Sequence, residues 1–207
     1  MAEEERKTKS VFREYVEAIL IAALLALFIR TFIVQAFKIP SGSMEDTLLV
    51  GDHILVNKFI YGTKIPFTEI KLFPIRQPKR GDIIVFKYPV DETKDFIKRL
   101  IGTPGDVVEI VDKQVYVNGT PLKEPYTVYK DSDLVPRDLQ SRDNYGPVKV
   151  PAGKYLALGD NRDRSSDGRF WGFLDEKEIV GQALVIYWSW DGDDSTVRWK
   201  RFGTIVK

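Results

Sequence analysis

The chain has 207 residues, of which 31 are Lys or Arg and 30 are Asp or Glu, so its formal net charge is +1. A nucleic-acid-binding protein usually concentrates a basic excess on one face, and this balance argues against that class. The sequence contains no cysteine and a single histidine, His53. This composition excludes disulfides, cysteine nucleophiles and zinc sites built from cysteines or several histidines. It also excludes a Ser-His-Asp triad unless His53 is the base, and we expect neither a metal nor a cofactor.

A long apolar stretch follows a short charged segment. Residues 18–29 are wholly apolar, Arg30 interrupts them, and apolar residues continue to Val34. About 20 helical residues cross a bilayer, so we expect a transmembrane helix at residues 15–36, with Arg30 near one end. A cleavable signal peptide and a buried helix of a soluble protein are the alternatives. The sequence FIVQAF at residues 32–37 is a poor match to a small-x-small cleavage site.

The basic residues before this helix predict its orientation. The positive-inside rule counts Lys and Arg, of which residues 1–14 contain Arg6, Lys7, Lys9 and Arg13. We therefore expect residues 1–14 in the cytoplasm and residues 37–207 outside it. The sequence Ile39-Pro40 favours extended backbone and is expected to end the helix.

The rest of the chain shows no long helical period. Short β-branched segments separated by turn residues occupy residues 53–59, 82–88, 106–111, 114–118, 154–159 and 183–190. Asp112-Lys113 and Asn118-Gly119 are expected to form tight turns between neighbouring segments. This spacing predicts a mostly β domain of sheets or a partly closed barrel. Residues 126–150 are more polar and irregular, as expected of an excursion from that domain.

Two segments offer a nucleophile and a base. The turn sequence Ser41-Gly42-Ser43 directly follows the apolar helix; taken alone it reads as a linker, but it can also present a hydroxyl to a cleft. In a strand at residues 96–106, Lys98 shares a face with Phe96 and Leu100. An ordinary surface lysine is the simpler interpretation. A lysine desolvated among apolar groups has a lowered pKa, and its neutral amine can take a proton from a serine.

A third segment, GDNRDRSSDGRFWG at residues 159–172, is polar and flanked by glycines. Its aspartates offer oxygen ligands for calcium, but the EF-hand spacing is absent and three arginines oppose a cation. A buried Asp–Arg network that orients other groups fits the composition better.

Together these runs resemble type I signal peptidase, the bacterial leader peptidase family. Five stretches match in order: the apolar helix ending Arg30-x-Phe32; IPSGSM (39–44) with Thr47-Leu48; GDHILVNKF (51–59); RGDIIVFKYP (80–89) with FIKRLIGTPGD (96–106); and residues 159–172. The resemblance implies an extracytoplasmic, mostly β catalytic domain with a Ser/Lys dyad. It also implies a reduced second β subdomain at about residues 107–155.

The resemblance assigns roles to individual residues. Ser43 matches the nucleophile and Lys98 the general base. The Ser43 backbone N–H and the Ser41 hydroxyl match the oxyanion site. Ser165 matches a serine that orients the lysine.

Asp167 and Arg169 match a supporting polar pair. Two positions depart from the family, which often has proline where this chain has Asp46 and serine where it has Gly168. Neither position carries the chemistry.

The expected activity is that of a serine endopeptidase that removes signal peptides from exported preproteins. An extended substrate points its first and third residues to the same side, so two shallow pockets would require small-x-small (Ala-x-Ala) sequences. The expected partners are preproteins, membrane lipid and the protein-export machinery, and the expected location is the bacterial inner membrane, crossed once. The candidate pocket walls, each of which could equally be ordinary core, are Phe37, Ile39, Pro40, Met44, Leu48, Ile54, Val85, Phe96 and Ile97.

Some alternatives stay open. One is a Ser/Lys self-cleaving protein, and another is a membrane-tethered β binding module without catalysis, in which Ser43 and Lys98 need not be close. His53 lies within an apolar segment and is interpreted as structural. The aromatic residues near the carboxyl terminus, Tyr187, Trp188, Trp190, Trp199 and Phe202, fit either a lipid-facing surface or core packing.

Overall fold

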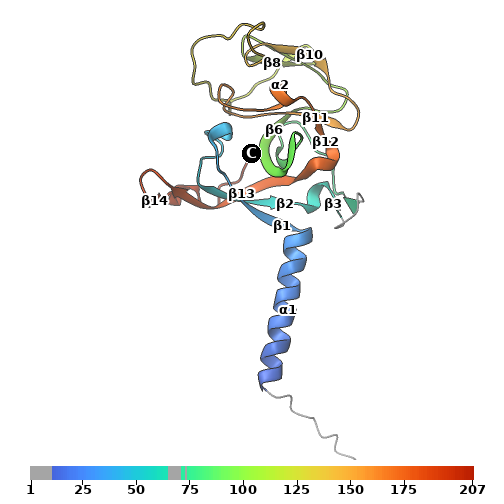
Figure 1. Ribbon diagram of the computed structural model, residues 1–207, viewed down its shortest axis with the longest axis vertical. Coiled ribbons are helices and arrows are strands. Elements are labelled where there is room, and N and C mark those ends of the chain that lie inside the picture. Colours follow the sequence, from blue (N-terminus) through green and yellow to red (C-terminus); the bar gives the residue numbers. More distant parts are fainter. Residues whose placement is uncertain (1–10, 65–70, 73) are drawn as a thin grey trace, which may run out of the picture.

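The computed structural model describes residues 11–64, 71–72 and 74–207. A long helix, α1 (Val11–Phe32), leads into a body made almost entirely of β-strands (Figure 1). The mostly β fold predicted from the short β-branched segments is confirmed.

Helix α1 stands away from the body as a stalk (Figure 1), and none of its residues is buried. Among the described residues it is the one helix long and apolar enough to cross a membrane. It ends at Phe32 rather than at the predicted residue 36, and Ile39-Pro40 is not its terminator. The reason is that residues 34–38 form a strand, β1, whose backbone pairs with β2. Residues 1–10 of the predicted cytoplasmic segment lie outside the described residues.

The large sheet carries both halves of the candidate site. Its strands follow the order β1 (Val34–Lys38), β2 (Asp52–Asn57), β13 (Ile179–Asp191), β5 (Ile83–Tyr88), β6 (Asp91–Gly102), β11 (Lys154–Leu158) and β12 (Leu174–Asp175), and β14 (Thr196–Val197) pairs with β13. All these pairings are antiparallel. Strand β6 therefore lies between β5 and β11, in the interior of the sheet.

A second sheet lies at the end of the body away from α1 (Figure 1). It has the order β10 (Tyr145–Lys149), β7 (Val107–Val111), β8 (Gln114–Val117) and β9 (Thr120–Pro121). The predicted turn at Asp112-Lys113 joins β7 and β8, with φ of 48° and 71°, as a two-residue hairpin turn requires. The predicted turn at Asn118-Gly119 likewise has φ of 53° and 77°.

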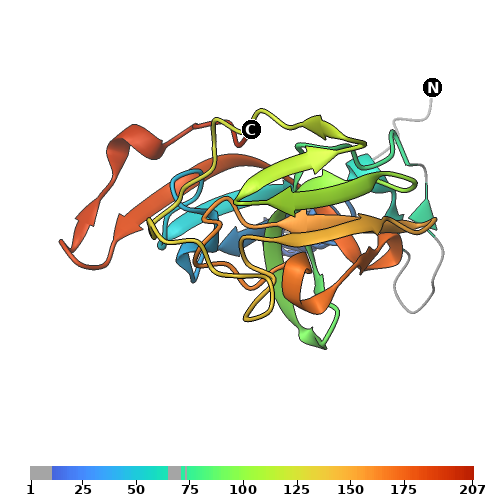
Figure 2. The ribbon, with the colours of Figure 1, turned by 90° about the horizontal axis from the view of Figure 1, so that it is seen from above.

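The remaining elements are short. A two-stranded ladder joins β3 (Thr63–Lys64) to β4 (Lys71–Leu72). The helical turns are η1 (Gly42–Met44), η2 (Phe59–Tyr61), α2 (Gly168–Trp171), η3 (Glu176–Glu178) and η4 (Trp199–Arg201). In the view along α1, the hairpin of β13 and β14 projects sideways from the body (Figure 2).

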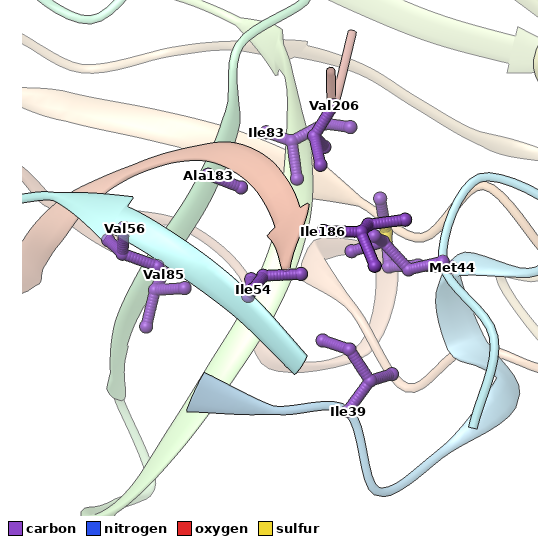
Figure 3. Close-up of a cluster of buried hydrophobic side chains, with 10 residues drawn as sticks. Ile39, Met44, Ile54, Val56, Ile83, Val85, Ala183, Ile186 and Val206 are labelled. Carbon is purple, nitrogen blue, oxygen red and sulfur yellow. The ribbon is translucent and has the colours of Figure 1, made fainter. Parts of the chain in front are cut away.

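A buried apolar cluster joins β2, β5 and β13 to the segment that follows β1 (Figure 3). Strand β2 alternates buried and half-buried residues, as expected of a strand with one face on the core. Ile39 and Met44 insert into this cluster from either side of the Ser41–Ser43 turn and are 2% and 0% exposed. The core thus fixes both ends of the turn that carries Ser43.

Candidate active site

Ser43 lies in the short helical turn η1, held by backbone bonds as well as by the core. The Ile39 N–H donates to the Asp52 carbonyl and the Gly51 N–H donates to the Ile39 carbonyl, which ties the approach to η1 to the start of β2. After the turn, the Leu48 N–H donates to the Met44 carbonyl. The Ser43 side chain is therefore presented from a backbone with little freedom.

Lys98 approaches Ser43 from β6. Its Nζ atom lies 2.7 Å from Ser43 Oγ and also donates to the Ile97 carbonyl at 2.9 Å. The side chain is 3% exposed, and Nζ lies 5.4 Å from the centre of the Phe96 ring. The predicted face shared by Lys98 and Phe96 is thus present. A buried amine at hydrogen-bond distance from a hydroxyl has the geometry of a base and a nucleophile.

Burial sets the proton affinity of this amine. Desolvation lowers the pKa of Lys98 to about 8, because a charged ammonium is disfavoured away from water. The carboxylates of Asp167 and Asp160 act in the opposite direction, and Arg169 adds to the lowering. The amine is consequently neutral in a substantial fraction of molecules near pH 8.

An open cleft of about 480 Å³ gives access to both side chains. Pro40, Ser41 and Ser43 line one side, and Phe96, Ile97 and Lys98 line the other. Ser41 is exposed and its hydroxyl makes no capping bond to η1. This hydroxyl is free to donate to a group in the cleft.

A carboxylate–arginine pair joins the Ser43 turn to β6. Asp160 accepts two bonds from Arg99, at 2.8 and 2.7 Å, and one from Thr47 Oγ1 at 2.6 Å. Arg99 follows Lys98 in β6, and Thr47 follows the turn that carries Ser43. Sequence reasoning predicted an Asp–Arg network in residues 159–172 but not that Arg99 and Thr47 belong to it.

Asn161 adds a second connection to the same turn. Its backbone N–H donates to the Ser43 carbonyl at 3.2 Å, and its side-chain amide donates to the Gly42 carbonyl at 3.1 Å. The polar, glycine-flanked composition of residues 159–172 was the only signal in the sequence, and it does not identify partners that are more than a hundred residues away.

Asp167 and Arg169 form a buried pair of their own. Arg169 donates to both carboxylate oxygens of Asp167, and Asp167 also accepts from the Gly159 N–H at 3.0 Å. Burial alone would raise the pKa of Asp167, but the Arg169 charge and these hydrogen bonds outweigh it and lower that pKa. The carboxylate remains charged and keeps the Gly159 segment in place beside Lys98.

One family model and several named proteins are similar to this chain. The family model described as signal peptidase, peptidase S26, matches residues 12–188. Signal peptidase I of Pseudomonas aeruginosa is 38% identical, over 86% of this chain and 72% of that protein. Signal peptidase I P of Bacillus subtilis subsp. natto is 34% identical, over 92% and 97%. A crystal structure of a signal peptidase I from Enterococcus faecalis V583 matches 52% of this chain and 97% of that one, with 35% identity and a TM-score of 0.42.

The chain belongs to the signal peptidase family, peptidase S26. The resemblance noted in the sequence is confirmed, and the protein is a serine endopeptidase with signal-peptide-removing function.

The signal peptidase fold places the predicted lysine-orienting serine close to the site without the expected bond. Ser165 is 5% exposed, and its hydroxyl is not hydrogen-bonded to Lys98; it lies near Asp167, where it helps to lower the pKa of that carboxyl. Ser165 also packs against Gly159, where an added Cβ would lie 2.2 Å from Ser165 Oγ. The arrangement brings Ser165 beside the Ser43 turn, with its hydroxyl near Asp167 rather than bonded to Lys98.

The predicted pocket walls divide into two groups. Pro40, Phe96 and Ile97 line the cleft, and Phe37 lines a neighbouring hollow. The others pack in the buried cluster behind the cleft, because their side chains face the sheet interior: Ile39, Met44, Leu48, Ile54 and Val85. These five residues do not line the cleft, and substrate contact by Pro40, Phe96, Ile97 and Phe37 stays a prediction.

The structure also shows what surrounds His53 and Gly168, two positions singled out in the sequence. His53 packs edge-on against Tyr187, with ring centres 5.9 Å apart, and it does not line the cleft. At Gly168 an added Cβ would lie 2.7 Å from Leu156 Cδ1. The serine that other signal peptidases often have there would require Leu156 to shift in this chain.

Replacing Gly159 by alanine is expected to displace the backbone and side chains that pack against Gly159 beside Ser43. The new Cβ would lie 2.2 Å from Ser165 Oγ and 2.5 Å from the Ser43 carbonyl oxygen. We expect a loss of about 1–3 kcal/mol in the free energy of unfolding, together with lower activity. Thermal unfolding and precursor cleavage measure the two effects. Gly192→Ala is the control, because nothing lies within 4 Å of its added Cβ; equal behaviour of the two variants would contradict the prediction.

Proposed function

We propose that this signal peptidase is a membrane-anchored enzyme that uses Ser43 as the nucleophile and Lys98 as the general base. The observation that carries the proposal is the 2.7 Å separation of Lys98 Nζ and Ser43 Oγ inside a buried, apolar surrounding. A binding module without catalysis gives no reason for a lysine to be desolvated against a serine. The geometry therefore favours catalysis over that alternative.

The proposed reaction is the hydrolysis of one peptide bond. Neutral Lys98 takes the Ser43 proton as Ser43 Oγ attacks the scissile carbonyl carbon. The resulting oxyanion accepts hydrogen bonds from the Ser43 N–H and the Ser41 hydroxyl, each worth roughly 3 kcal/mol in such sites. The Lys98 ammonium then gives its proton to the leaving amine. In the second half, Lys98 takes a proton from water as the water oxygen attacks the acyl carbon. The Lys98 ammonium then returns a proton to Ser43 Oγ as the bond between Oγ and the acyl carbon breaks, which releases the carboxylic acid product and restores the neutral amine.

The proposed specificity for small residues is supported by the residues that line the cleft. Pro40 on one side and Phe96 and Ile97 on the other leave room for an extended peptide between them. The first and third residues before the scissile bond face the same side of such a peptide. We propose that both face the floor above the core cluster, where large side chains do not fit, so that cleavage follows Ala-x-Ala.

Helix α1 supplies the proposed anchor. Its exposed apolar side chains and its length fit a single membrane crossing in the bacterial inner membrane. We place residues 1–14 in the cytoplasm and residues 37–207 outside it, where exported preproteins emerge from the export machinery.

Aromatic side chains near the end of β13 fit a second contact with lipid. Trp188, Trp190 and Trp199 are 37%, 40% and 71% exposed. In Figure 1 the β13–β14 hairpin lies on the α1 side of the second sheet. Indole rings favour the membrane interface, so we propose that this surface rests on it.

The test is cleavage of a purified exported precursor by the full-length protein in detergent. We expect cleavage directly after Ala-x-Ala, and we expect a precursor with phenylalanine in place of the last alanine to be cleaved at least about 100-fold more slowly, because the larger side chain does not fit the proposed shallow pocket. Product masses identify the bond. Equal cleavage of the two precursors would refute the small-pocket argument, and cleavage of the enzyme's own chain alone would favour the self-cleaving alternative.

A further inference from the structure

Three hollows follow one another from the catalytic cleft to the side of α1. The cleft shares Asp95 with a second hollow of about 370 Å³, and the second shares Gln35 with a third of about 550 Å³. The third is bordered by Ile29 and Arg30 of α1. We call the second hollow the approach pocket. It lies between the cleft and the helix that leads to the membrane.

The strand spacing fixes which part of a substrate reaches the approach pocket. Asp95 precedes Lys98 by three residues in β6, and Lys87 pairs with Asp95 from β5. At about 3.3 Å per residue, the pocket begins about 10 Å from Lys98 along the strand. A signal peptide whose apolar segment lies in the membrane must run from Ser43 toward α1. Its residues from about the fourth to the sixth before the scissile bond then lie at this pocket.

The approach pocket contains a half-buried lysine that forms no ion pair with any described residue. Lys58 is half-buried, and among the described residues no carboxylate lies within the 4 Å of an ion pair. Burial and the nearby charge of Arg30 lower the pKa of Lys58; the carboxylate of Asp95 acts in the opposite direction, and Lys87 adds to the lowering. A hydrogen-bond acceptor beside the Lys58 ammonium would offset the cost of its burial and the repulsion by the neighbouring cations.

The acidic groups of the same pocket are already engaged or exposed. Asp95 forms an ion pair with Lys87 at 2.9 Å. Glu178 accepts a hydrogen bond from the Asp175 N–H at 3.3 Å, and Glu92 is exposed. Lys58 is therefore the half-buried charge of the approach pocket with no ion pair among the described residues; Glu92 and Lys177, which also line the pocket, are exposed.

We propose that the approach pocket is the subsite for the polar residues four to six positions before the scissile bond, and that Lys58 makes it prefer hydrogen-bond acceptors to Lys or Arg. The proposal rests on the proposed function, since it takes Ser43 as the point of cleavage. It makes Lys58 a specificity-determining residue outside the catalytic pair. The acceptor is an Asp, Glu, Asn or Gln side chain of the substrate.

The experiment compares two precursors that differ only at the fifth residue before the scissile bond, which is Asp in one and Lys in the other, both with Ala-x-Ala. The full-length protein is assayed in a zwitterionic detergent. A partly buried ion pair contributes about 1 kcal/mol, so we expect kcat/KM to favour Asp about fivefold, mainly through KM. In Lys58→Met the ratio is expected to fall to about one, and in Lys58→Glu to reverse.

Lys123→Met is the matched control, because Lys123 is exposed and does not line the approach pocket. It should keep the wild-type ratio. Equal cleavage of both precursors by the wild type, or an unchanged ratio in Lys58→Met, overturns the subsite and leaves the proposed function standing as long as the Ala-x-Ala bond is still cut. Failure to cut that bond at all overturns both. An effect of Lys58→Met that appears only after adding anionic lipid vesicles, whichever precursor is used, would assign the pocket to lipid and also overturn the proposal.

Discussion

Replacing Ser43 by alanine is expected to lower kcat for precursor cleavage by at least about 10³-fold. The reason is that no other hydroxyl lies within hydrogen-bond distance of Lys98 Nζ among the described residues. Without Oγ there is no acyl-enzyme, and water is left to attack without an oriented nucleophile. The measurement is the rate of product formation from a purified precursor, under single-turnover conditions.

Ser166→Ala is the matched control for this variant. Ser166 lines the same cleft but is exposed and has no bond to Lys98. We expect it to keep activity within about fivefold, as surface substitutions usually do. The Ser43 variant should unfold at nearly the wild-type temperature. Turnover retained by a folded Ser43→Ala protein would remove Ser43 as the nucleophile.

Lys98→Met is expected to lower kcat for precursor cleavage by about as much as Ser43→Ala. Methionine has a similar length and suits the apolar surroundings of Phe96, but it has no amine to accept the Ser43 proton. Lys98→Arg is also expected to be inactive, because a guanidinium stays protonated. Since the two side chains act as a unit, the Ser43→Ala/Lys98→Met double variant should be no slower than either single variant. Near-normal activity of the arginine variant would exclude the amine as the base.

The pH dependence tests the same amine in the wild type. A pKa of about 8 for Lys98 means that the neutral, active form increases as pH rises. We expect kcat/KM to rise roughly tenfold between pH 7 and pH 9, with a midpoint near pH 8. A flat profile, or a fall over this range, would contradict a neutral lysine base.

The free energy of unfolding should also rise with pH. The pKa of Lys98 is lowered in the folded state, so above pH 8 the unfolded chain binds more protons than the folded one. The free energy of unfolding of the wild type should therefore rise with pH from about 8 to the unfolded-state pKa of about 10.4. Lys98→Met lacks this contribution, so its stability relative to the wild type is expected to be greatest below pH 8. Urea unfolding at several pH values measures the difference.

Local patterns in the sequence were sufficient for much of the secondary structure, and a family resemblance was needed to name the proposed reactive pair. The apolar run of residues 18–29 lies in α1, and Asp112-Lys113 makes the hairpin turn of the second sheet. These features depend on residues that are neighbours in the chain, so periodicity and turn chemistry report them. Ser43 and Lys98 could be named because the motifs around them match a family, not because any pattern shows that two residues 55 positions apart meet.

The contacts across the sheet could be decided only by the tertiary structure. Pairing of β1 with β2 ends α1 at Phe32, which hydropathy alone could not indicate. Burial between β5 and β11 desolvates Lys98, and the bonds from Arg99 and Thr47 to Asp160 tie β6 to the Ser43 turn. The position of Lys58 in the approach pocket, where it forms no ion pair with a described residue, is also decided by contacts between strands. A local pattern states which residue types alternate on a strand, but strand order and register determine which side chains share a cleft, and those are properties of the whole chain.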